Sequence, residues 1–415
     1  MRFDKFMKKI VSLFCIITTL LGNSIIFANE EDTEVIDYVW IDEVVEEAKK
    51  EETPEILSKN AVVYERNSNQ ILFGKDENEK VPMASTTKIM TAIVLVEELE
   101  KRDISFNAEV IVEKQAAIIQ GSRLGLSTGD KITYNDLLCG LMICSGNDAA
   151  VQIAISIGGS IEGFAELMNN KAKELGLANT NFVTPHGLDK DNHYTTAYEL
   201  AIMTDYALNK EKIREVVSTQ NCNVIINGRA KNISNTNELL GYLEGVNGVK
   251  TGFTNKAGRC LVTSVNRDGF EIITVVLGAD TKKVRTKDSI KLIEYTYKEY
   301  QVINLEKLIE EEFKKWNKIN KGRININKAK ANNVEIKLEE YLQKEYVVKK
   351  DEIENIWFEA SCNYNLEAPV LKNYKVGEFN VNINNKIIES IDLLINKTIE
   401  RKSIYDYIFE ILEWV

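Results

Sequence analysis

The chain has 415 residues, of which 44% are hydrophobic and 28% are charged. This is a globular composition, and the chain is long enough to form two domains and to bury a large core in at least one of them. The formal net charge is −11, which argues against nucleic acid as a partner because the phosphate backbone attracts basic proteins.

Residues 1–28 have the pattern of a secretory signal peptide. A basic start precedes an apolar run from Ile10 to Leu21, and Ala28 suits cleavage. An uncleaved membrane anchor is the alternative, because only Asn23 and Ser24 interrupt the apolar stretch. Under both interpretations, the remainder of the chain is expected outside the cytoplasm.

The next segments predict a leader and the start of the fold. Residues 29–55 are rich in Asp and Glu and predict a solvated acidic leader, with some helix around Ile41 to Lys50. Ala61–Tyr64 and Gln70–Phe73 flank an Asn-Ser-Asn turn and predict a β-hairpin. Ile89–Val96 is apolar except for one threonine, which predicts a helix buried on most sides.

Ser85 and Lys88 lie one helical turn apart at the start of this apolar helix. If Ser85 opens the helix, its hydroxyl and the Lys88 amine share one face. The amine can then take the hydroxyl proton, and the free N–H groups of the helix start can stabilise a developing oxyanion. The pair alone is weak evidence, because serine is also a common N-cap.

Two later motifs make the catalytic interpretation stronger. Ser145-Gly146-Asn147 follows an apolar helix that begins with a capping box at Thr133. Lys250-Thr251-Gly252 enters a predicted strand. Ser-x-x-Lys, Ser-Asn-type and Lys-Thr-Gly motifs in this order are the signature of penicillin-binding proteins and class A β-lactamases, here with Gly146 in place of the usual Asp.

The sequence between and after these motifs predicts a series of helices followed by a sheet. His186 and His193 frame a loop whose spacing suits no common metal-ligand pattern, so no metal site is expected. The apolar periodicity and β-branched content predict helices over Ala149–Ile157, Ile161–Leu175 and Asp288–Tyr297, a helix capped at Thr196, and antiparallel strands from Val249, over Arg259–Val265 and over Ile272–Val276.

From Val302 onward the composition changes, with more Lys, Asn and Glu and less Gly. Short alternating segments, such as Val334–Leu338 and Phe379–Ile383 before an Asn-Asn turn, predict a small β-domain without catalytic residues. Residues 403–415 predict an amphipathic helix that is too short to span a bilayer. Binding to a membrane surface and packing on the β-domain both remain open, since Asp406, Glu410 and Glu413 oppose anionic lipid.

The cysteines outside the signal segment are expected to be free thiols. Their number is odd, their spacing is scattered, and a chain of this size needs no disulfide framework. Cys144, beside Ser145, receives little weight as a nucleophile because no adjacent base is evident. These cysteines are Cys139, Cys144, Cys222, Cys260 and Cys362.

From about Ala61 to the C-terminus the chain resembles the low-molecular-mass penicillin-binding proteins, which are serine-type D-alanyl-D-alanine carboxypeptidases. The resemblance implies a mixed α/β fold: a β-lactamase/transpeptidase-like catalytic domain over 56–298 with an antiparallel sheet and a helical subdomain, a C-terminal β-rich domain over 302–396, and the amphipathic helix over 403–415. Besides the three motifs, it is carried by Gly121–Leu126, Thr184–Asp189, Asn247–Val249, Thr254–Gly258 and, more weakly, Leu366–Val370.

The expected chemistry is acyl transfer through a serine ester. Ser85 attacks the carbonyl between the two terminal D-alanines of a peptidoglycan stem pentapeptide. Lys88 must be neutral to act as base, and burial together with the charge of Lys250 would lower its pKa. Ser145 relays the proton to the leaving amine. The oxyanion would lie between the backbone N–H groups of Ser85 and, by resemblance, Phe253.

Substrate binding is expected on both sides of Ser85. Asn147 would bind the substrate amide, Lys250 and Thr251 would hold the terminal carboxylate, and Gly252 would let the substrate backbone approach the strand. Family members often have an arginine in Ser-Asn-Arg-Asn, where this chain has Thr236. Arg285 is therefore another candidate for the carboxylate.

No cofactor or metal is expected, and β-lactam antibiotics are expected to act as covalent inhibitors because they mimic D-Ala-D-Ala. A β-lactamase, a D,D-endopeptidase and a non-enzymatic wall-binding protein are the alternatives. Class A β-lactamases use a dedicated glutamate for deacylation. The nearest match, Glu174, lies in an ordinary helix-end pattern, which favours a long-lived penicillin adduct.

Overall fold

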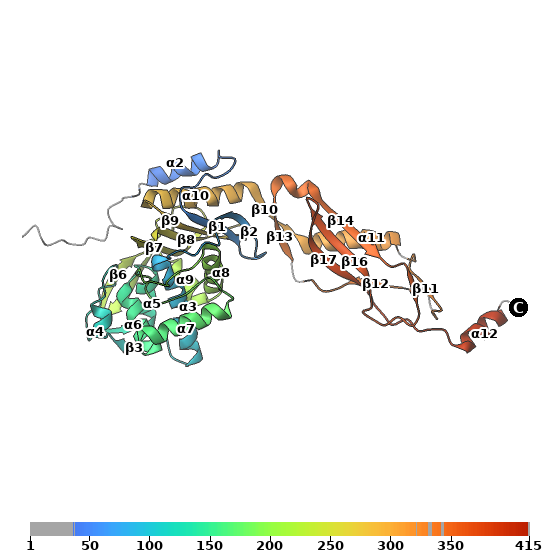
Figure 1. Ribbon diagram of the computed structural model, residues 1–415, viewed down its shortest axis with the longest axis horizontal. Coiled ribbons are helices and arrows are strands. Elements are labelled where there is room, and N and C mark those ends of the chain that lie inside the picture. The colour runs from blue at the N-terminus through green and yellow to red at the C-terminus, as the bar shows by residue number, and fades with distance from the viewer. Residues whose placement is uncertain (1–35, 37, 321, 331–333, 342–343, 414–415) are drawn as a thin grey trace, which may run out of the picture.

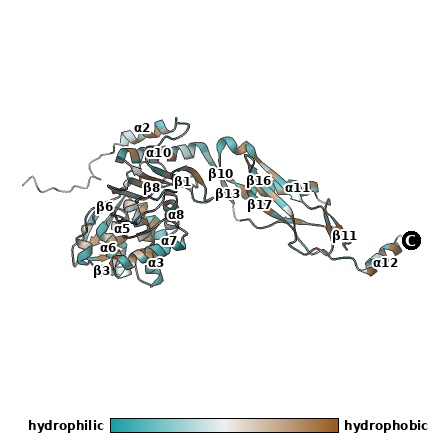
Figure 2. Cartoon of the chain, in the orientation of Figure 1, coloured by the Kyte–Doolittle hydropathy of each residue, from teal (hydrophilic) through white to brown (hydrophobic). Residues whose placement is uncertain are grey.

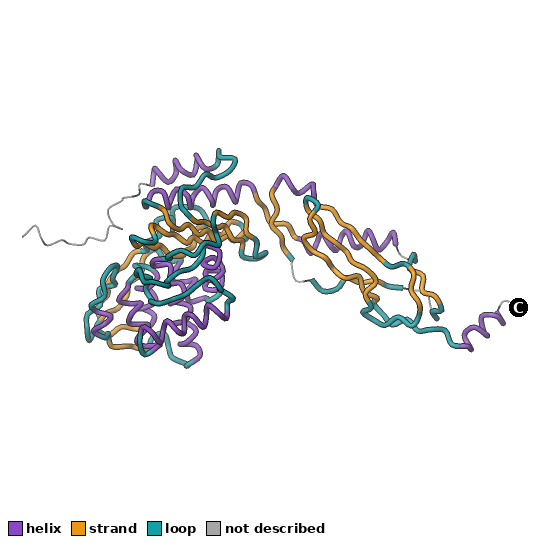
Figure 3. The backbone as a smooth tube through the Cα atoms, in the orientation of Figure 1, coloured by secondary structure: helices purple, strands orange, loops and turns teal. Residues whose placement is uncertain are grey.

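The computed structural model describes residues 36, 38–320, 322–330, 334–341 and 344–413. The predicted signal peptide lies outside the described residues. The molecule is elongated, with a large mixed α/β part at one end and a narrower, strand-rich part at the other (Figure 1). The secondary-structure colouring of Figure 3 separates the helical half of the large part from the sheet above it.

A five-stranded antiparallel sheet forms the centre of the large part, with the strand order β2-β1-β9-β8-β7. The predicted hairpin and the three predicted later strands are all present. Their near-continuous apolar runs reflect burial on both faces of the sheet. The strands are β1 (Asn60–Glu65), β2 (Ile71–Lys75), β7 (Val246–Thr254), β8 (Gly258–Arg267) and β9 (Phe270–Ala279).

Helix α10 (Lys282–Glu299) covers one face of the sheet, and α2 (Tyr38–Ala48) packs against α10 (Figure 1). Ile41, Val44 and Ala48 of α2 are each 2% exposed, and Ile41 and Val44 share a core with residues of α10 and of the sheet. The prediction that residues 29–55 form a solvated leader is therefore wrong for α2. Its apolar residues recur at helical spacing, so one face is buried while the acidic face remains in water.

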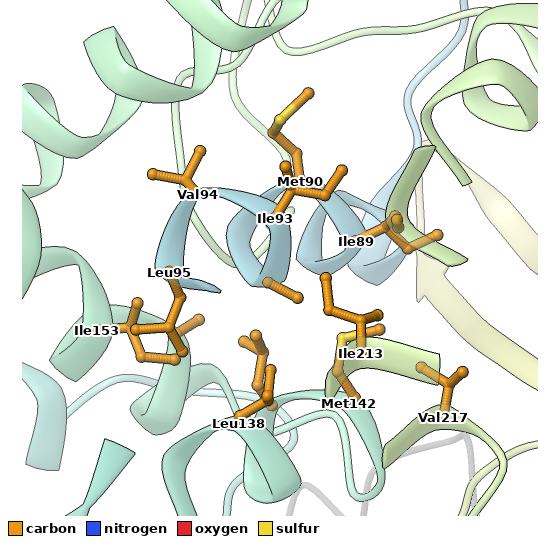
Figure 4. Packing of buried hydrophobic residues seen from close by; sticks show 14 of the residues in the cluster. Ile89, Met90, Ile93, Val94, Leu95, Leu138, Met142, Ile153, Ile213 and Val217 are labelled. Carbon is orange, nitrogen blue, oxygen red and sulfur yellow. The ribbon is translucent and has the colours of Figure 1, made fainter. Parts of the chain in front are cut away.

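The helical region covers the other face, built around α3 (Lys88–Lys101). Side chains of α3 pack against Leu138, Met142, Ile153 and neighbouring residues (Figure 4). The remaining elements here are β3 (Glu109–Ile111), α4 (Lys114–Ala117), β4 (Lys131–Thr133), α5 (Tyr134–Met142), α6 (Asn147–Gly158), α7 (Ile161–Glu174), α8 (Ala197–Leu208), α9 (Glu211–Val217), β5 (Asn221–Ile226) and β6 (Arg229–Ser234).

The narrower part contains a four-stranded sheet in the order β12-β17-β16-β14. The predicted turn at Asn384 and Asn385 is present, with positive φ at both residues. A helix that the sequence analysis did not predict, α11 (Leu305–Asn320), packs on this sheet through Leu305 and Ile309. The strands and short helix are β11 (Asn325–Asn327), β12 (Ile336–Leu338), η3 (Lys350–Asn355), β14 (Ile356–Cys362), β15 (Asn365–Glu367), β16 (Lys375–Ile383) and β17 (Lys386–Ile395).

Two sets of contacts join the two parts of the molecule. Strand β10 (Tyr300–Asn304), which follows α10 directly, pairs antiparallel with β13 (Glu345–Lys349). Gln70, at the start of β2, exchanges two hydrogen bonds with the backbone of Val347, at 3.0 and 2.7 Å. The junction is therefore a hydrogen-bonded ladder reinforced by a side-chain clamp.

Helix α12 (Ile404–Glu413) lies at the far end of the chain, away from the other elements, as the hydropathy colouring of Figure 2 also shows. Ile404, Phe409 and Leu412 are 72%, 66% and 63% exposed. The alternative that this helix packs on the β-domain is therefore wrong. None of the described helices combines the length and apolar character that crossing a bilayer requires.

Candidate active site

Ser85 lies in a short 3-10 turn, η2 (Ala84–Thr87), that leads directly into α3. Ala84 has a φ of 48°, a strained value for a residue with a β-carbon. The turn is held by hydrogen bonds from the Thr86 hydroxyl to Met83 O and from the Thr87 hydroxyl to Ala84 O, at 2.5 and 2.7 Å. The backbone before the nucleophile is thus rigidly positioned.

Lys88 is completely buried at the first position of α3. Its Nζ lies 2.9 Å from Ser85 Oγ, 2.7 Å from Asn147 Oδ1 and 2.9 Å from the carbonyl oxygen of His186. Asn147 Nδ2 donates to Gln120 O, which fixes the amide so that Oδ1 faces the lysine. Among these partners, Asn147 Oδ1 and His186 O are pure acceptors, whereas the serine hydroxyl can also donate.

Ser145 joins α5 to α6 and is 3% exposed, with a left-handed φ of 61°. The neighbouring glycine replaces the aspartate of the common motif for a steric reason. A β-carbon at Gly146 would lie 2.9 Å from Asp148 Oδ1 and 3.0 Å from Leu124 N. The tight connection between α5 and α6 therefore excludes a side chain at Gly146, which separates Ser145 from Asn147.

Strand β7 is the last strand of the sheet and packs directly against η2. A β-carbon at Gly252 would lie 3.1 Å from both Ser85 N and Ala84 Cβ, so glycine allows the strand to approach the nucleophile. Lys250 is buried and donates to Thr251 O at 3.1 Å. The three predicted motifs therefore come from separate elements, and Asn147 and Gly252 bring the second and third of them to the Ser85–Lys88 pair.

Thr236, which stands where relatives often have arginine, lies beside the Lys-Thr-Gly motif. Its hydroxyl is 2.7 Å from that of Thr251. Arg285 lines a pocket with these two threonines but is engaged in a buried ion pair with Glu238. Burial favours the neutral form of Glu238, yet the Arg285 charge and the Thr286 hydroxyl leave its pKa below the usual range.

Phe253 follows Gly252 on β7, where its backbone N–H was expected to contribute to the oxyanion site. Its ring stacks on the guanidinium of Arg259, with 3.8 Å between the guanidinium carbon and the ring centroid. Arg259 is also its backbone partner on β8. This cation–π contact holds the end of β7 in place and gives the pocket beside Thr251 a second arginine.

His193 is a positioning residue that the sequence analysis did not identify. Its Nδ1 accepts a hydrogen bond from Val183 N at 2.9 Å, so the proton is on Nε2, which donates to the Thr87 hydroxyl at 2.8 Å. That hydroxyl in turn donates to Ala84 O. Burial lowers the pKa of His193 to about 4 and that of His186 to about 3. Both rings are neutral at physiological pH.

Asp148 is a second residue whose role only the structure reveals. Its buried carboxylate accepts hydrogen bonds from the backbone N–H groups of Leu124, Gly125 and Leu126, at 2.8, 2.7 and 2.9 Å. These bonds fix the loop whose carbonyl groups, at Gln120 and Ser122, hold Asn147. Asn147 of the Ser-x-Asn motif is thus positioned indirectly by the next residue, Asp148.

Cys144, which is next to Ser145, is not activated as a nucleophile. The Cys144 thiol bonds to Gly140 O at 3.2 Å, and burial raises its pKa to about 11, so it is no thiolate nucleophile. Within the described ranges, all five cysteines are free, as expected. The same part of the chain holds no group of three or more His, Cys, Asp or Glu side chains suited to a metal ion.

A buried lysine in contact with a serine at a helix start, beside an edge strand, defines a serine acyl-transfer site. Family models confirm the class. Residues 47–281 match the family described as D-alanyl-D-alanine carboxypeptidase, and residues 310–401 match the C-terminal domain of penicillin-binding protein 5. The chain belongs to the serine-type D-alanyl-D-alanine carboxypeptidases, the low-molecular-mass penicillin-binding proteins, so the predicted family, fold class and enzyme class are confirmed.

Individual relatives agree with this assignment. The chain is 35% identical over 322 residues to D-alanyl-D-alanine carboxypeptidase DacF of Bacillus subtilis, covering 77% of this chain and 80% of the relative. It is 29% identical over 381 residues to DacC of Escherichia coli, covering 86% and 88%. Among solved structures, penicillin-binding protein 5 from Haemophilus influenzae has a TM-score of 0.69 at 26% identity and covers 84% of this chain and 99% of its own.

Proposed function

We propose that Ser85 is the nucleophile and Lys88 the general base of this carboxypeptidase. The contacts of Lys88 support the proposal most directly. A neutral amine has two N–H groups and one lone pair, and the two pure acceptors, Asn147 Oδ1 and His186 O, match the two N–H groups. The Ser85 hydroxyl lies 2.9 Å from Nζ, within reach of the lone pair of a neutral amine. This geometry supports Lys88 as the group that accepts the serine proton.

The substrate would lie along β7 as an additional extended segment. In this arrangement the backbone N–H groups of Ser85 and Phe253 bind the carbonyl oxygen that becomes the oxyanion. The second N–H of Asn147 Nδ2 donates to the preceding substrate amide. Lys250 and Thr251 hold the terminal carboxylate, with Arg285 as the nearby cation of the same pocket.

The reaction then runs in two steps. Ser85 Oγ forms an ester bond with the penultimate D-alanine carbonyl, and the C–N bond to the last D-alanine breaks. Ser145, which is 3% exposed, passes the proton held by Lys88 to the leaving amine. Water afterwards hydrolyses the ester, with Lys88 again taking the proton, and restores the free serine.

The decisive experiment combines Ser85→Ala with penicillin labelling followed by mass spectrometry. The variant should release no D-alanine from a D-Ala-D-Ala pentapeptide and should form no penicillin adduct, while losing only about 1 kcal/mol of stability as a small residue in a helix start. Cys144→Ala is the matched control and should keep both activities. A labelled Ser85→Ala protein would place the nucleophile elsewhere.

The same experiment, followed over time, separates a carboxypeptidase from a β-lactamase. Glu174, the nearest match to a deacylating glutamate, is a surface side chain paired with Lys171 at 2.7 Å. After the peptide reaction D-alanine leaves room for water, whereas the expelled nitrogen of penicillin stays tethered. The penicillin adduct on the wild-type protein should therefore outlast many cycles of D-alanine release. Rapid adduct loss with steady penicillin hydrolysis would indicate a β-lactamase.

We also propose that the chain is exported by its signal segment, that 56–298 and 302–396 are its two domains, and that α12 binds a membrane surface. The exposed apolar residues of α12 support surface binding. The segments that pair with one another just before α12 carry more basic than acidic side chains. The exposed basic residues are Lys328, Lys330, Lys372, Lys397 and Arg401, and the carboxylates are Glu367 and Glu400. This excess of positive charge offsets the negative charge of the acidic residues of α12.

Deleting residues 403–415 tests the membrane proposal. The truncated protein should move from the membrane fraction to the soluble fraction, while its turnover of small D-Ala-D-Ala peptides should stay within about twofold because the site lies at the other end of the molecule. A truncated protein that still sediments with membranes would assign the attachment to the signal segment or to the β-domain.

A further inference from the structure

A pocket of about 500 Å³ adjoins Thr251 of the Lys-Thr-Gly motif, and Thr236, Glu238 and Arg285 are among the residues that line it. The proposed function places the terminal carboxylate of the substrate beside Thr251, with Arg285 as a nearby cation. Glu238 therefore puts a second carboxylate on the wall of a site that binds a carboxylate. Because like charges repel in a partly buried site, this residue should influence how tightly the substrate is bound.

Glu238 contacts Arg285 directly. It lies in the segment between β6 and β7, and its Oε1 accepts hydrogen bonds from Arg285 Nη2 and from the Thr286 hydroxyl, both on α10. The side chains of Glu238 and Arg285 are only 12% and 5% exposed. Water and salt screen such a buried pair weakly. The negative charge of Glu238 therefore compensates the positive charge of Arg285 inside the pocket.

This ion pair uses only part of the guanidinium. The contact joins one nitrogen and one oxygen, and within the described residues neither Arg285 Nε nor Glu238 Oε2 has a hydrogen-bond partner. A guanidinium has five N–H groups, so it can donate to two carboxylates at once. Arg285 can thus bind the substrate carboxylate while it is paired with Glu238, but with much of its charge already compensated.

The backbone around Glu238 is fixed against β7. Asn237 Nδ2 donates to Gly248 O at 2.8 Å, and the Thr236 hydroxyl is 2.7 Å from that of Thr251. Glu238 is therefore held beside the Lys-Thr-Gly motif. Thr236 is neutral at the position where relatives often have arginine. The positive charge that Glu238 compensates is thus not replaced by one at position 236.

We propose that Glu238 is a positioning residue that acts through Arg285 and weakens the binding of the terminal carboxylate. This rests on the proposed function, which places that carboxylate beside Thr251. The leaving D-alanine carries the same carboxylate, so weaker binding also favours its release. Because the carboxylate is bound alike in the ground state and in the transition state, Glu238 raises KM and leaves kcat nearly unchanged.

The test is Glu238→Gln in the full-length protein, with an acyl-tripeptide that ends in D-Ala-D-Ala. Glutamine keeps the size of the side chain and an acceptor oxygen but removes the charge. KM should fall by about threefold while kcat stays within about twofold of the wild-type value. Competitive inhibition by D-alanine should become stronger by a similar factor. Glu244→Gln, the same change at an exposed residue of the same segment, is the matched control and should leave these values unchanged.

A second background tests whether Glu238 acts through Arg285. Burial favours the neutral form of Glu238, and the Arg285 charge is the main interaction that keeps its pKa low. In Arg285→Gln, Glu238 should therefore lose most of its charge. Adding Glu238→Gln to that variant should change KM by less than about 1.5-fold. A structural role alone would not make the effect on KM depend on the arginine.

The outcomes separate the inference from the proposed function. An unchanged or higher KM in Glu238→Gln, or the same decrease in both backgrounds, would overturn the inference. Penicillin labelling of Ser85 shows that each variant is folded, and Glu238→Met, which has a similar length and no charge, replaces a glutamine variant that is not labelled. A wild-type protein that releases no D-alanine at all would instead contradict the proposed function.

Discussion

The backbone conformation of Ala84 is fixed by contacts with several other segments of the chain. Its strained φ of 48° is held by the Thr87 hydroxyl on its carbonyl oxygen, and by the close approach of two glycines. A β-carbon at Gly187 would lie 1.8 Å from Ala84 O, and one at Gly252 would lie 3.1 Å from Ala84 Cβ. The strain is therefore over-determined by its surroundings and orients the next residue, Ser85.

The chain of bonds from His193 to Ala84 predicts a pH-dependent loss of stability. The pKa of His193 is about 4 in the folded protein and about 6.5 in an unfolded chain. The unfolded state therefore binds more protons between these values, and stability falls as the pH drops through this window, by about 3 kcal/mol for this residue.

Urea unfolding of the wild type and of His193→Gln at pH 7 and pH 4.5 measures this contribution. The variant should be less stable at pH 7, but its further loss on acidification to pH 4.5 should be smaller than that of the wild type by about 2 kcal/mol. Other titrating groups are shared by both proteins and cancel in the comparison. Equal losses in the two proteins would show that His193 is not the buried neutral base described above.

At the scale of elements, the site is assembled from connections rather than from helix interiors. Ser85 lies in the turn before α3, and Ser145 lies between α5 and α6. The loop from Gly121 to Leu126 has no regular secondary structure of its own, and Asp148 supplies the acceptors that its backbone lacks. The precision of the site therefore depends on buried side-chain bonds to loops.

Asp148→Ala should destabilise the protein by about 3 kcal/mol and slow acylation by penicillin, because two buried N–H groups and one part-buried N–H group lose their acceptor and Asn147 loses its support. Thermal unfolding and the rate of penicillin labelling measure the two effects. Asp130→Ala, which removes a carboxylate bonded to Ser127 N near the surface of the same loop, is the control and should cost less than about 1 kcal/mol. Equal effects of the two substitutions would contradict this role.

The sequence predicted most strands because alternation is a local signal, and its short motifs marked Ser85, Lys88 and Asn147, which the structure brings into contact. The sequence did not predict those features that depend on which distant segment a helix or strand packs against. Leu305 and Ile309 of α11 recur at helical spacing, but the prediction for the chain from Val302 onward was a β-domain, based on alternating segments further along. The role of His193 and the pairing of Arg285 with Glu238 depend on contacts between distant segments, which no local pattern contains.

At the scale of the whole molecule, the junction between the two parts determines how freely they move. Besides the β10–β13 ladder and the Gln70 clamp, the Tyr300 hydroxyl donates to Leu72 O at 3.0 Å. These bonds cross from the central sheet to the narrower part, and Val347 is buried among them. A junction of this kind behaves as a stiff connection rather than as a flexible linker.

Gln70→Ala tests this stiffness. The substitution leaves the N–H and C=O groups of Val347 without their partner and should cost about 1–2 kcal/mol of local stability. Hydrogen exchange in β13 should become faster, while cleavage of small peptides should remain unchanged because Gln70 lies away from the site. The control is Asn67→Ala, whose contact with Glu345 is long, at 3.4 Å. Unchanged exchange in β13 would mean that the ladder alone holds the junction.

The stiff junction has a consequence for where the enzyme can work. With α12 resting on a lipid surface, an unbending arm would carry Ser85 at one constant height above it, whatever the orientation of the arm around the surface normal. Stem peptides would then be trimmed only within a thin layer at that height, and strands lying deeper in the wall would escape. The distance from α12 to Ser85, rather than the affinity of the active site, would then determine which layer of the peptidoglycan loses its terminal D-alanine.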